Sequence, residues 1–200
     1  SRERIPLCFF LSFSGEDGKK QSGIRSRDLW EKLRGLCKKG VCLTGFQIKD
    51  YYSCLGDAVE TEYLFDVLIT SYLLNPLKSD YQLEDVAQEY LGLGISSYSQ
   101  LFGKKSAAEA MSEQRDDFVQ YLCRCADVLL RSKPVLEEKL KKTEQFELFR
   151  EIEMPLSKVL FHMEQVGVLV KPEELKEYGD ALVGRIAELE KSVWEKAGCE

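Results

Sequence analysis

The sequence contains a single histidine, His162, and no Cys-x-x-Cys motif, so it lacks the usual ligand pattern of a zinc site. Its seven cysteines lie among apolar residues rather than between turns, unlike those of a disulfide-stabilised secreted domain. They are Cys8, Cys37, Cys42, Cys54, Cys123, Cys125 and Cys199. We therefore interpret them as buried, reduced thiols and expect a cytoplasmic protein.

Long apolar runs and an excess of basic residues are also missing. The run from Pro6 to Phe13 is far shorter than the roughly 20 apolar residues that a membrane-spanning helix needs, and no secretory signal follows Ser1. The net charge of −6 disfavours a protein that coats nucleic acid with its whole surface, although it permits a local basic site. We expect a monomer that does not bind membranes.

The first two thirds of the chain combine short apolar runs with amphipathic segments. Strands are expected at residues 7–13 and 41–46. Helices, one of them mixed with extended structure at 63–74, are expected at residues 26–37, 47–55, 63–74, 83–91, 96–102 and 107–131, and Pro134 is expected to begin a further helical turn. This order predicts an α/β fold with a short or incomplete sheet that is covered by helices.

From Glu144 onward the pattern is helical throughout. Apolar residues keep a helical spacing up to Gly167, and Pro155 is expected either to kink this helix or to lie in the first turn of a second one. A last helix begins near Pro172 and keeps a 3.6-residue period for about six turns. Since such a helix needs a partner surface, we expect the chain to be a piece of a longer protein.

The segment 118–130 is the most informative one for chemistry. Phe118, Leu122, Cys125 and Leu129 form an apolar stripe at helical spacing, and Tyr121 lies one turn before Cys125. A tyrosine followed four residues later by a carboxylate would be a plausible element of a metal-dependent hydrolase. Here the second position holds a thiol.

Several stretches together resemble a known family. Residues 65–76 and 83–92 resemble the 3′–5′ exonuclease domain of bacterial DNA polymerase I (family A). Residues 151–168 resemble the passage into the polymerase domain of that family, and residues 186–198 its first long helix. The resemblance covers about Val41 to Glu200. It implies a ribonuclease H-like exonuclease fold at residues 1–143 and the N-terminal polymerase helices, toward the thumb, at residues 144–200.

The resemblance also implies where metal ligands would stand. In this family, proofreading uses two metal ions that are held by Asp-x-Glu, Asn-x-x-x-Asp and Tyr-x-x-x-Asp patterns. The last pattern falls on Tyr121 and Cys125 of this sequence. The first has no counterpart, unless Leu11 and Phe13 stand in its place.

The second pattern fits in two registers. One register keeps Asp50 but has Phe46 in place of the asparagine. The other keeps an amide at Gln47 but has Tyr51 in place of the aspartate. A neutral phenol or thiol is a poor ligand for Mg²⁺, which prefers carboxylate oxygens. The resemblance thus implies a nuclease fold, while the residues argue against nuclease activity.

We therefore expect a catalytically inactive, structural exonuclease-like domain. By resemblance, the full-length enzyme is a DNA-directed DNA polymerase of replication and repair, which binds DNA and deoxynucleoside triphosphates and uses Mg²⁺ outside this chain. One alternative is an active nuclease, in which Asp50, Asp66 and Glu16 or Asp17 converge with Asp127. The other alternative is an interaction module that is not attached to a polymerase.

Three further features receive structural interpretations. The loop from Gly103 to Ser106 lacks the upstream glycine of a phosphate-binding loop. His162 is interpreted as a partly buried packing residue. The basic residues near the end of the central helical region are interrupted by acids and are interpreted as a solvated face of mixed charge; they are Arg131, Lys133, Lys139, Lys141 and Lys142.

Overall fold

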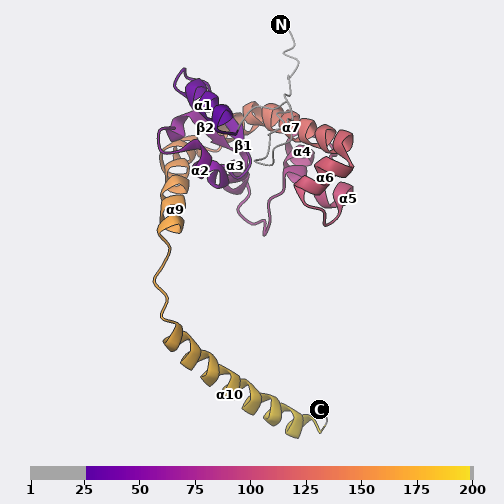
Figure 1. The fold of residues 1–200 in the computed structure, drawn as a ribbon, viewed down its shortest axis with the longest axis vertical. Helices are drawn as coiled ribbons and strands as arrows, with labels where there is room; N and C mark the ends of the chain where they lie inside the picture. Colours follow the sequence, from indigo (N-terminus) through magenta and orange to yellow (C-terminus); the bar gives the residue numbers. More distant parts are fainter. Residues whose placement is uncertain (1–25, 199–200) are drawn as a thin grey trace, which may run out of the picture. The chain divides into compact units, whose positions relative to one another are not determined.

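The computed structural model describes residues 26–198, which divide into two compact units with the boundary after His162. Figure 1 shows the order of the elements along the chain. The predicted strand at residues 7–13 lies outside the described residues. The predicted domain division after Thr143 stays a prediction; the compact unit itself continues past it, because Phe149 and Met154 belong to the core of the first unit.

The first unit contains two short strands and a series of helices. Its elements are α1 (Ser26–Cys37), β1 (Leu43–Gly45), the 3₁₀ helix η1 (Ile48–Tyr51), α2 (Tyr52–Leu55), the 3₁₀ helix η2 (Thr61–Tyr63), β2 (Leu64–Asp66), α3 (Val67–Leu74), α4 (Leu83–Leu91), α5 (Tyr98–Phe102), α6 (Ala107–Glu113), α7 (Arg115–Lys142), α8 (Phe146–Leu148), the π-helical segment η3 (Phe149–Glu153) and α9 (Met154–Val166), whose last residues belong to the second unit.

The sheet of the described residues consists of β1 and β2, which pair in parallel with Leu43 opposite Leu64 and Gly45 opposite Asp66. The expected short sheet covered by helices is thereby confirmed. The two strands differ in burial: all three residues of β2 are buried, whereas all three residues of β1 are only half-buried.

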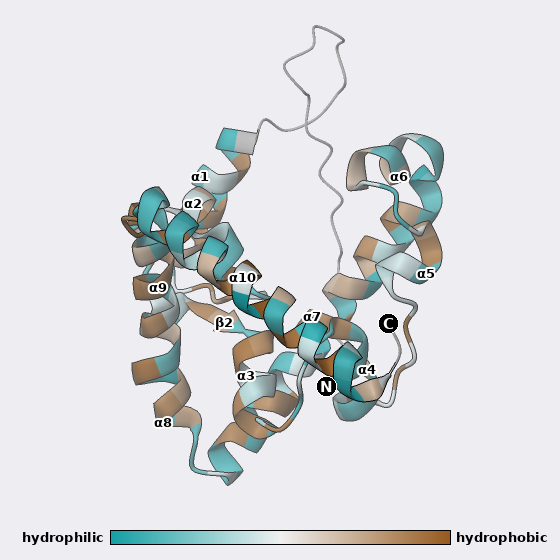
Figure 2. Ribbon diagram, turned by 90° about the horizontal axis from the view of Figure 1, so that it is seen from below, coloured by the Kyte–Doolittle hydropathy of each residue, from teal (hydrophilic) through white to brown (hydrophobic). Residues whose placement is uncertain are grey.

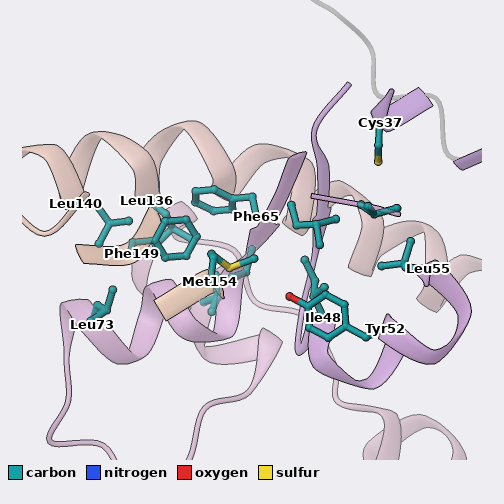
Figure 3. Packing of buried hydrophobic residues seen from close by; sticks show 14 residues of the cluster. Cys37, Ile48, Tyr52, Leu55, Phe65, Leu73, Leu136, Leu140, Phe149 and Met154 are labelled. Carbon is teal, nitrogen blue, oxygen red and sulfur yellow. The ribbon is translucent and has the colours of Figure 1, made fainter. Parts of the chain in front are cut away.

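Helix α7 packs against α3, α4, α6 and β1. Figure 3 shows Leu136 and Leu140 of this helix beside Phe149, Met154 and Leu73 in the main core. These residues are almost completely buried, and the ring of Phe149 lies 5.1 Å from that of Phe65. A second, smaller cluster forms around the start of α7 from Phe102, Ala110 and Phe118, with Tyr98, Met111 and Tyr121 against it.

Three details of the helix prediction for this region are wrong. Pro134 does not begin a new helical turn but lies inside the continuous α7, where burial of Leu136 and Leu140 offsets the roughly 3 kcal/mol that an internal proline costs. The single helix expected from residue 107 is divided at Gln114 into α6 and α7. Leu122, placed on the apolar stripe, is exposed, because Tyr121 occupies the aromatic cluster instead.

Helix α9 follows the π-helical segment, and Pro155 lies in its first turn, as one of the two alternatives for this proline predicts. The helix is attached to the region after α2 by polar contacts. Ser157 Oγ lies 2.9 Å from the Tyr52 hydroxyl, and Lys158 Nζ donates hydrogen bonds to two carbonyl oxygens of residues 57 and 59. The half-exposed His162 lies 3.0 Å from an Asp57 carboxylate oxygen, so its main contact is polar.

The second unit is formed mainly by α10 (Pro172–Ala197), and the predicted long helix is confirmed. Figure 2 shows its hydrophobic residues interspersed with hydrophilic ones along the helix. The apolar residues that keep the 3.6-residue period are exposed within this unit; they are Leu175, Tyr178, Leu182, Ile186, Leu189 and Val193. None of the helices between residues 26 and 198 is both long enough and apolar enough to cross a membrane.

Candidate functional site

The described part of the first unit contains a cleft of about 770 Å³ beside β1, here called the β1 cleft. It is lined by β1, η1 and α7, together with residues of α1, α4 and α5. The lining residues are Trp30, Leu33, Leu43, Thr44, Gly45, Phe46, Ile48, Tyr51, Leu55, Leu64, Gln82, Leu83, Glu84, Ser97, Tyr98, Ser99, Tyr121, Cys125 and Leu129. Most of these side chains are apolar or aromatic, and Glu84 is the only acid among them.

The structure brings three of the sequence-predicted positions together in this cleft: Tyr51, Tyr121 and Cys125. Tyr51 ends η1, and its ring centroid lies 6.3 Å from that of Trp30 in α1. Asp50, the previous residue, does not line the cleft; its carboxylate accepts a hydrogen bond of 2.9 Å from Gln47 Nε2 at the surface. Tyr51 therefore lines the cleft and Asp50 does not, while the choice between the two registers stays a prediction.

Tyr121 and Cys125 form a hydrogen-bonded pair on one face of α7. Burial raises the pKa of the Tyr121 hydroxyl, and the hydrogen bond with Cys125 raises it further. Burial also raises the pKa of the Cys125 thiol, which the hydrogen bond from Tyr121 partly counteracts. Both groups are therefore neutral near pH 7. Cys125 is half-buried at the wall of the cleft and not in the core.

The buried carboxylate of Asp66 accepts hydrogen bonds from four backbone N–H groups, and we call this arrangement the Asp66 clasp. One oxygen accepts hydrogen bonds from the backbone N–H groups of Gln47 (3.2 Å), Leu68 (2.8 Å) and Ile69 (3.4 Å), and the other from Ile48 (2.6 Å). Burial raises the pKa of this carboxyl group, and the four hydrogen bonds act in the opposite direction. The clasp caps α3 and joins it to η1, so these donors occupy the oxygens that a metal ion would need.

Asp127, the other acid of the nuclease alternative among the described residues, does not line the cleft. Asp127 pairs with Arg131 at 3.4 Å on the surface of α7, in agreement with its interpretation as a solvated or ion-paired residue. Glu16, Asp17, Leu11 and Phe13 lie outside the described residues. Between residues 26 and 198, no three histidine, cysteine, aspartate or glutamate side chains are grouped so that they could hold a metal ion.

The basic side chains of α7 have partners that explain their spacing. Arg131, Lys141 and Lys142 each form an ion pair with the acid four residues earlier. Lys133 lies over the ring of Phe65 at 5.7 Å, and Lys139 over that of Tyr90 at 5.3 Å. The interpretation as a face of mixed charge is thus confirmed.

The loop at Gly103 also has a local structural role. Its last residue, Ser106, accepts a hydrogen bond from the Glu109 N–H and forms a capping box at the start of α6. Lys105 pairs with Glu113 at 2.9 Å. These contacts agree with the interpretation of this stretch as a surface loop and not a phosphate-binding one.

The thiols are less uniformly buried than the sequence predicts. Within residues 26–198 all five cysteines are free, and only Cys37 is fully buried. Cys54 is exposed, and Cys42, Cys123 and Cys125 are intermediate. The expectation of burial is therefore wrong for Cys54 and holds only in part for Cys42, Cys123 and Cys125.

Sequence reasoning did not identify the α1 and α5 contributions to the cleft. Trp30 and Leu33 lie in the helix that the sequence predicts at residues 26–37, but a helix prediction does not reveal that these two side chains border a cleft. The ring of Tyr98 in α5 lies edge to face with that of Tyr121, with 5.8 Å between the ring centroids, and the two residues are far apart in sequence. The only signal for this contact is the density of aromatic residues in the two segments.

Comparisons with known proteins identify the family of this domain. Residues 56–131 match the family model described as DNA polymerase I, ribonuclease H-like domain. The chain is 36% identical over 135 residues to DNA polymerase I of Bacillus subtilis (strain 168), which is 67% of this chain and 15% of that protein. It is 36% identical over 99 residues to DNA polymerase I of Streptococcus pneumoniae serotype 4, which is 50% of this chain and 11% of that protein.

A third relative shows that the similarity extends further than the resemblance noted in the sequence. DNA polymerase I of Geobacillus stearothermophilus is 26% identical over 191 residues, or 96% of this chain and 19% of that protein, so the similarity also includes residues before Val41. The chain spans less than a fifth of the length of each of these relatives. No solved structure matches it. The chain is therefore a member of the bacterial DNA polymerase I family that carries the family's ribonuclease H-like, exonuclease-like domain.

Proposed function

We propose that this chain is the catalytically inactive exonuclease-like part of a DNA-directed DNA polymerase, in which it has a structural role. The observation that supports this proposal is the composition of the β1 cleft. Two of the positions where the resemblance implies metal-binding carboxylates hold the phenol of Tyr51 and the thiol of Cys125, and both line this cleft.

The chemistry of the cleft is unsuited to the metal-dependent reaction. Two-metal hydrolysis needs oxygen ligands that carry enough negative charge to hold two divalent cations close together. The Cys125 thiol is protonated near pH 7 and is a soft ligand, and a tyrosine hydroxyl is neutral there. Among the residues that the structure describes, Glu84 is the only acid that lines the cleft, and one carboxylate is less charge than such a pair of ions requires.

We further propose that the whole protein synthesises DNA, which is the activity that the name of its relatives states. It would bind DNA and deoxynucleoside triphosphates and use Mg²⁺ held by parts that this chain does not cover. We also propose that the whole protein acts in DNA replication and repair, that it is located in the cytoplasm, and that it is a monomer. The second unit supports it indirectly, since the exposed apolar positions of α10 leave a face for packing against such further parts.

The test is a nuclease assay on the chain itself. The protein is incubated with a single-stranded oligonucleotide labelled at its 3′ end, with Mg²⁺ or Mn²⁺, and release of labelled nucleotide is followed. We expect no release above that of a metal-free sample. A proofreading-competent DNA polymerase I serves as the positive control for the assay.

The opposite outcome has a defined signature. Metal-dependent release that disappears in Asp50→Ala or Asp127→Ala, but persists in the matched surface variant Asp57→Ala, would establish the active-nuclease alternative. Asp57 is a suitable control because it is an exposed acid that is not among the cleft-lining residues, and its carboxylate contacts His162.

A further inference from the structure

Two pairs of aromatic rings line the β1 cleft, and we call these four the cleft rings. Trp30 of α1 and Tyr51 of η1 form one pair, with 6.3 Å between their ring centroids. Tyr98 of α5 and Tyr121 of α7 form the other pair, at 5.8 Å. None of the four residues is fully buried, so part of each is accessible to a molecule in the cleft.

The only charged side chain in the described lining of the cleft is an acid. Glu84, in the first turn of α4, is half-buried, and no lysine, arginine or histidine is among the described lining residues. Glu84 forms no ion pair within residues 26–198. Burial is the main cause that raises the pKa values of Tyr121 and Cys125, and the negative charge of Glu84 raises both further. The carboxylate therefore acts on the wall of the cleft that carries one of the cleft rings.

A cation is the kind of ligand that suits both features. The face of an aromatic ring attracts a cation, most strongly where water is partly excluded. A carboxylate adds a Coulomb attraction that is larger in a cleft than in open water. An anion would instead lie near the Glu84 carboxylate, with no basic side chain in the described lining to balance its charge.

The rest of the lining indicates the size and the body of the ligand. Many of the other lining side chains are leucines, which favour an apolar body beside the charge. The volume of about 770 Å³ lies within the range of roughly 300–1,000 Å³ that is typical of small-molecule sites.

We propose that the β1 cleft binds a small organic cation with an apolar body, which lies against the cleft rings with its charge near Glu84. A quaternary ammonium group attached to an aromatic body represents this class of ligand. The inference does not require the proposed function, because binding of a cation is measured by calorimetry, whereas nuclease activity is measured by nucleotide release.

The first experiment compares three phenols of similar shape that differ in charge. They carry a trimethylammonium, a tert-butyl or a sulfonate group opposite the hydroxyl, so the ligand is a cation, a neutral molecule or an anion. Each is titrated into the full chain at neutral pH and low salt, and the heat of binding gives its dissociation constant. We expect the trimethylammonium compound to bind roughly tenfold more tightly than the tert-butyl compound, and the sulfonate to bind most weakly.

The same series defines the results that contradict the proposal. Equal affinity for the cation and the neutral compound would mean that the cleft selects only for apolar surface. Tighter binding of the sulfonate would mean that the site is basic. Either result overturns the proposal, and so does the absence of binding by the cation at millimolar concentration.

A variant without the negative charge tests the role of Glu84. Glu84→Gln keeps the shape of the side chain and removes its charge. We expect the cation to bind about five- to tenfold more weakly to this variant, and the neutral compound to bind as it does to the parent. The matched control is Glu89→Gln on the same helix, whose carboxylate pairs with Lys78 and does not line the cleft. An equal loss in both variants, or a loss in neither, overturns the proposal.

A second pair of variants tests the cleft rings. Tyr51→Leu removes one ring and keeps the wall apolar, and it is expected to weaken binding of the cation several-fold. The control Tyr72→Leu replaces an exposed tyrosine outside the lining and should leave the affinity unchanged. Thermal unfolding followed by circular dichroism reports whether the variants are folded. If both variants keep the affinity of the parent, the rings do not hold the cation and the proposal is overturned.

The position of the bound cation is measured without altering the cleft. The chain has two tryptophans, so Trp194→Phe leaves Trp30 as the only tryptophan fluorophore. We expect the trimethylammonium compound to change the emission of Trp30 with the dissociation constant that calorimetry gives. Unchanged emission at saturation would place the cation elsewhere and overturn the proposal.

The same fluorescence titration distinguishes a nucleotide from a cation. Thymidine 5′-phosphate has an aromatic base but carries negative charge, so we expect it to bind more weakly than the trimethylammonium compound. If it changes the emission of Trp30 at lower concentration than the cation does, the cleft favours a nucleotide and the proposal is overturned.

Discussion

The Asp66 clasp and the β1 cleft lie at neighbouring strands of the same sheet, but the polar groups of the two sites have different surroundings. At the end of β2, a carboxylate is enclosed by four backbone N–H donors. Beside β1, the phenol of Tyr51 and the thiol of Cys125 line the cleft, and in one register of the resemblance both stand where carboxylates are implied. The acid in these two strands is Asp66, and it has a structural role.

The comparison distinguishes a position at which the fold needs an acid from a position at which it does not. Asp66 cannot leave without stranding buried donors, because Gln47, Ile48, Leu68 and Ile69 would lose their acceptor. No comparable group depends on an acid at position 125, where the thiol contacts Tyr121 beside an open cleft. We therefore expect a change at position 125 to leave the fold intact, and removal of the Asp66 carboxylate to destabilise it.

The largest expected effect is at the clasp. Asp66→Ala removes the acceptor for four buried or half-buried N–H groups and is expected to lower the free energy of unfolding by about 3 kcal/mol. Urea denaturation followed by circular dichroism measures the change. The exposed Asp50→Ala is the matched control and should cost less than about 0.5 kcal/mol. A loss of equal size in the two variants would show that the clasp is not a structural element.

A smaller effect is expected when a carboxylate is introduced into the cleft. Cys125→Asp places a charge in a half-buried, mostly apolar wall near Glu84 and is expected to cost about 1–2 kcal/mol. Cys125→Ser, which is polar but neutral, separates the effect of charge from that of size. We expect Cys125→Asp alone to give no nuclease activity, because Tyr51 remains at a second ligand position. Metal-dependent cleavage by this variant would refute that explanation.

For the Asp66 clasp and the β1 cleft, the sequence predicts local features better than it predicts how these features are arranged in space. The spacing of Tyr121 and Cys125 on one helix places them correctly on one face, because a helical period is a local property. The parallel pairing of β1 with β2 was not predicted, because residues 64–66 fall in a segment that was expected to be a helix mixed with extended structure. The clasp was not predicted, because the donors of Asp66 at Gln47 and Ile48 are 18–19 residues away in sequence.

The errors have the same origin. Pro134 predicts a helix start from its local chemistry, but the buried residues that follow it stabilise one continuous α7. Leu122 fits an apolar stripe, but the position of Tyr98 and Phe102 selects Tyr121 for the aromatic cluster. In both cases tertiary packing outweighs a local preference that was correctly identified.

Asp127 is an acid that belongs neither to the Asp66 clasp nor to the β1 cleft, so it can be compared with Asp66. Its ion pair with Arg131 lies on the solvated surface of α7, where such pairs contribute little. We expect Asp127→Ala to lower the free energy of unfolding by no more than about 0.5 kcal/mol. Arg131→Ala and the double variant complete a cycle that isolates the pair. A coupling energy as large as the effect of Asp66→Ala would contradict the distinction between clasp and surface.

The smallest effect concerns reaction rates, not stability. Because burial raises the pKa of Cys125, less of its reactive thiolate is present at pH 8, and iodoacetamide should modify it more slowly than the exposed Cys54. The difference should narrow as the pH is raised and vanish in urea. Tyr121→Phe removes the hydrogen bond that lowers the pKa of Cys125, so it should slow the reaction at pH 8 further. Faster modification in Tyr121→Phe would instead show that the tyrosine protects Cys125 by covering it, and that its hydrogen bond has little influence on the thiol.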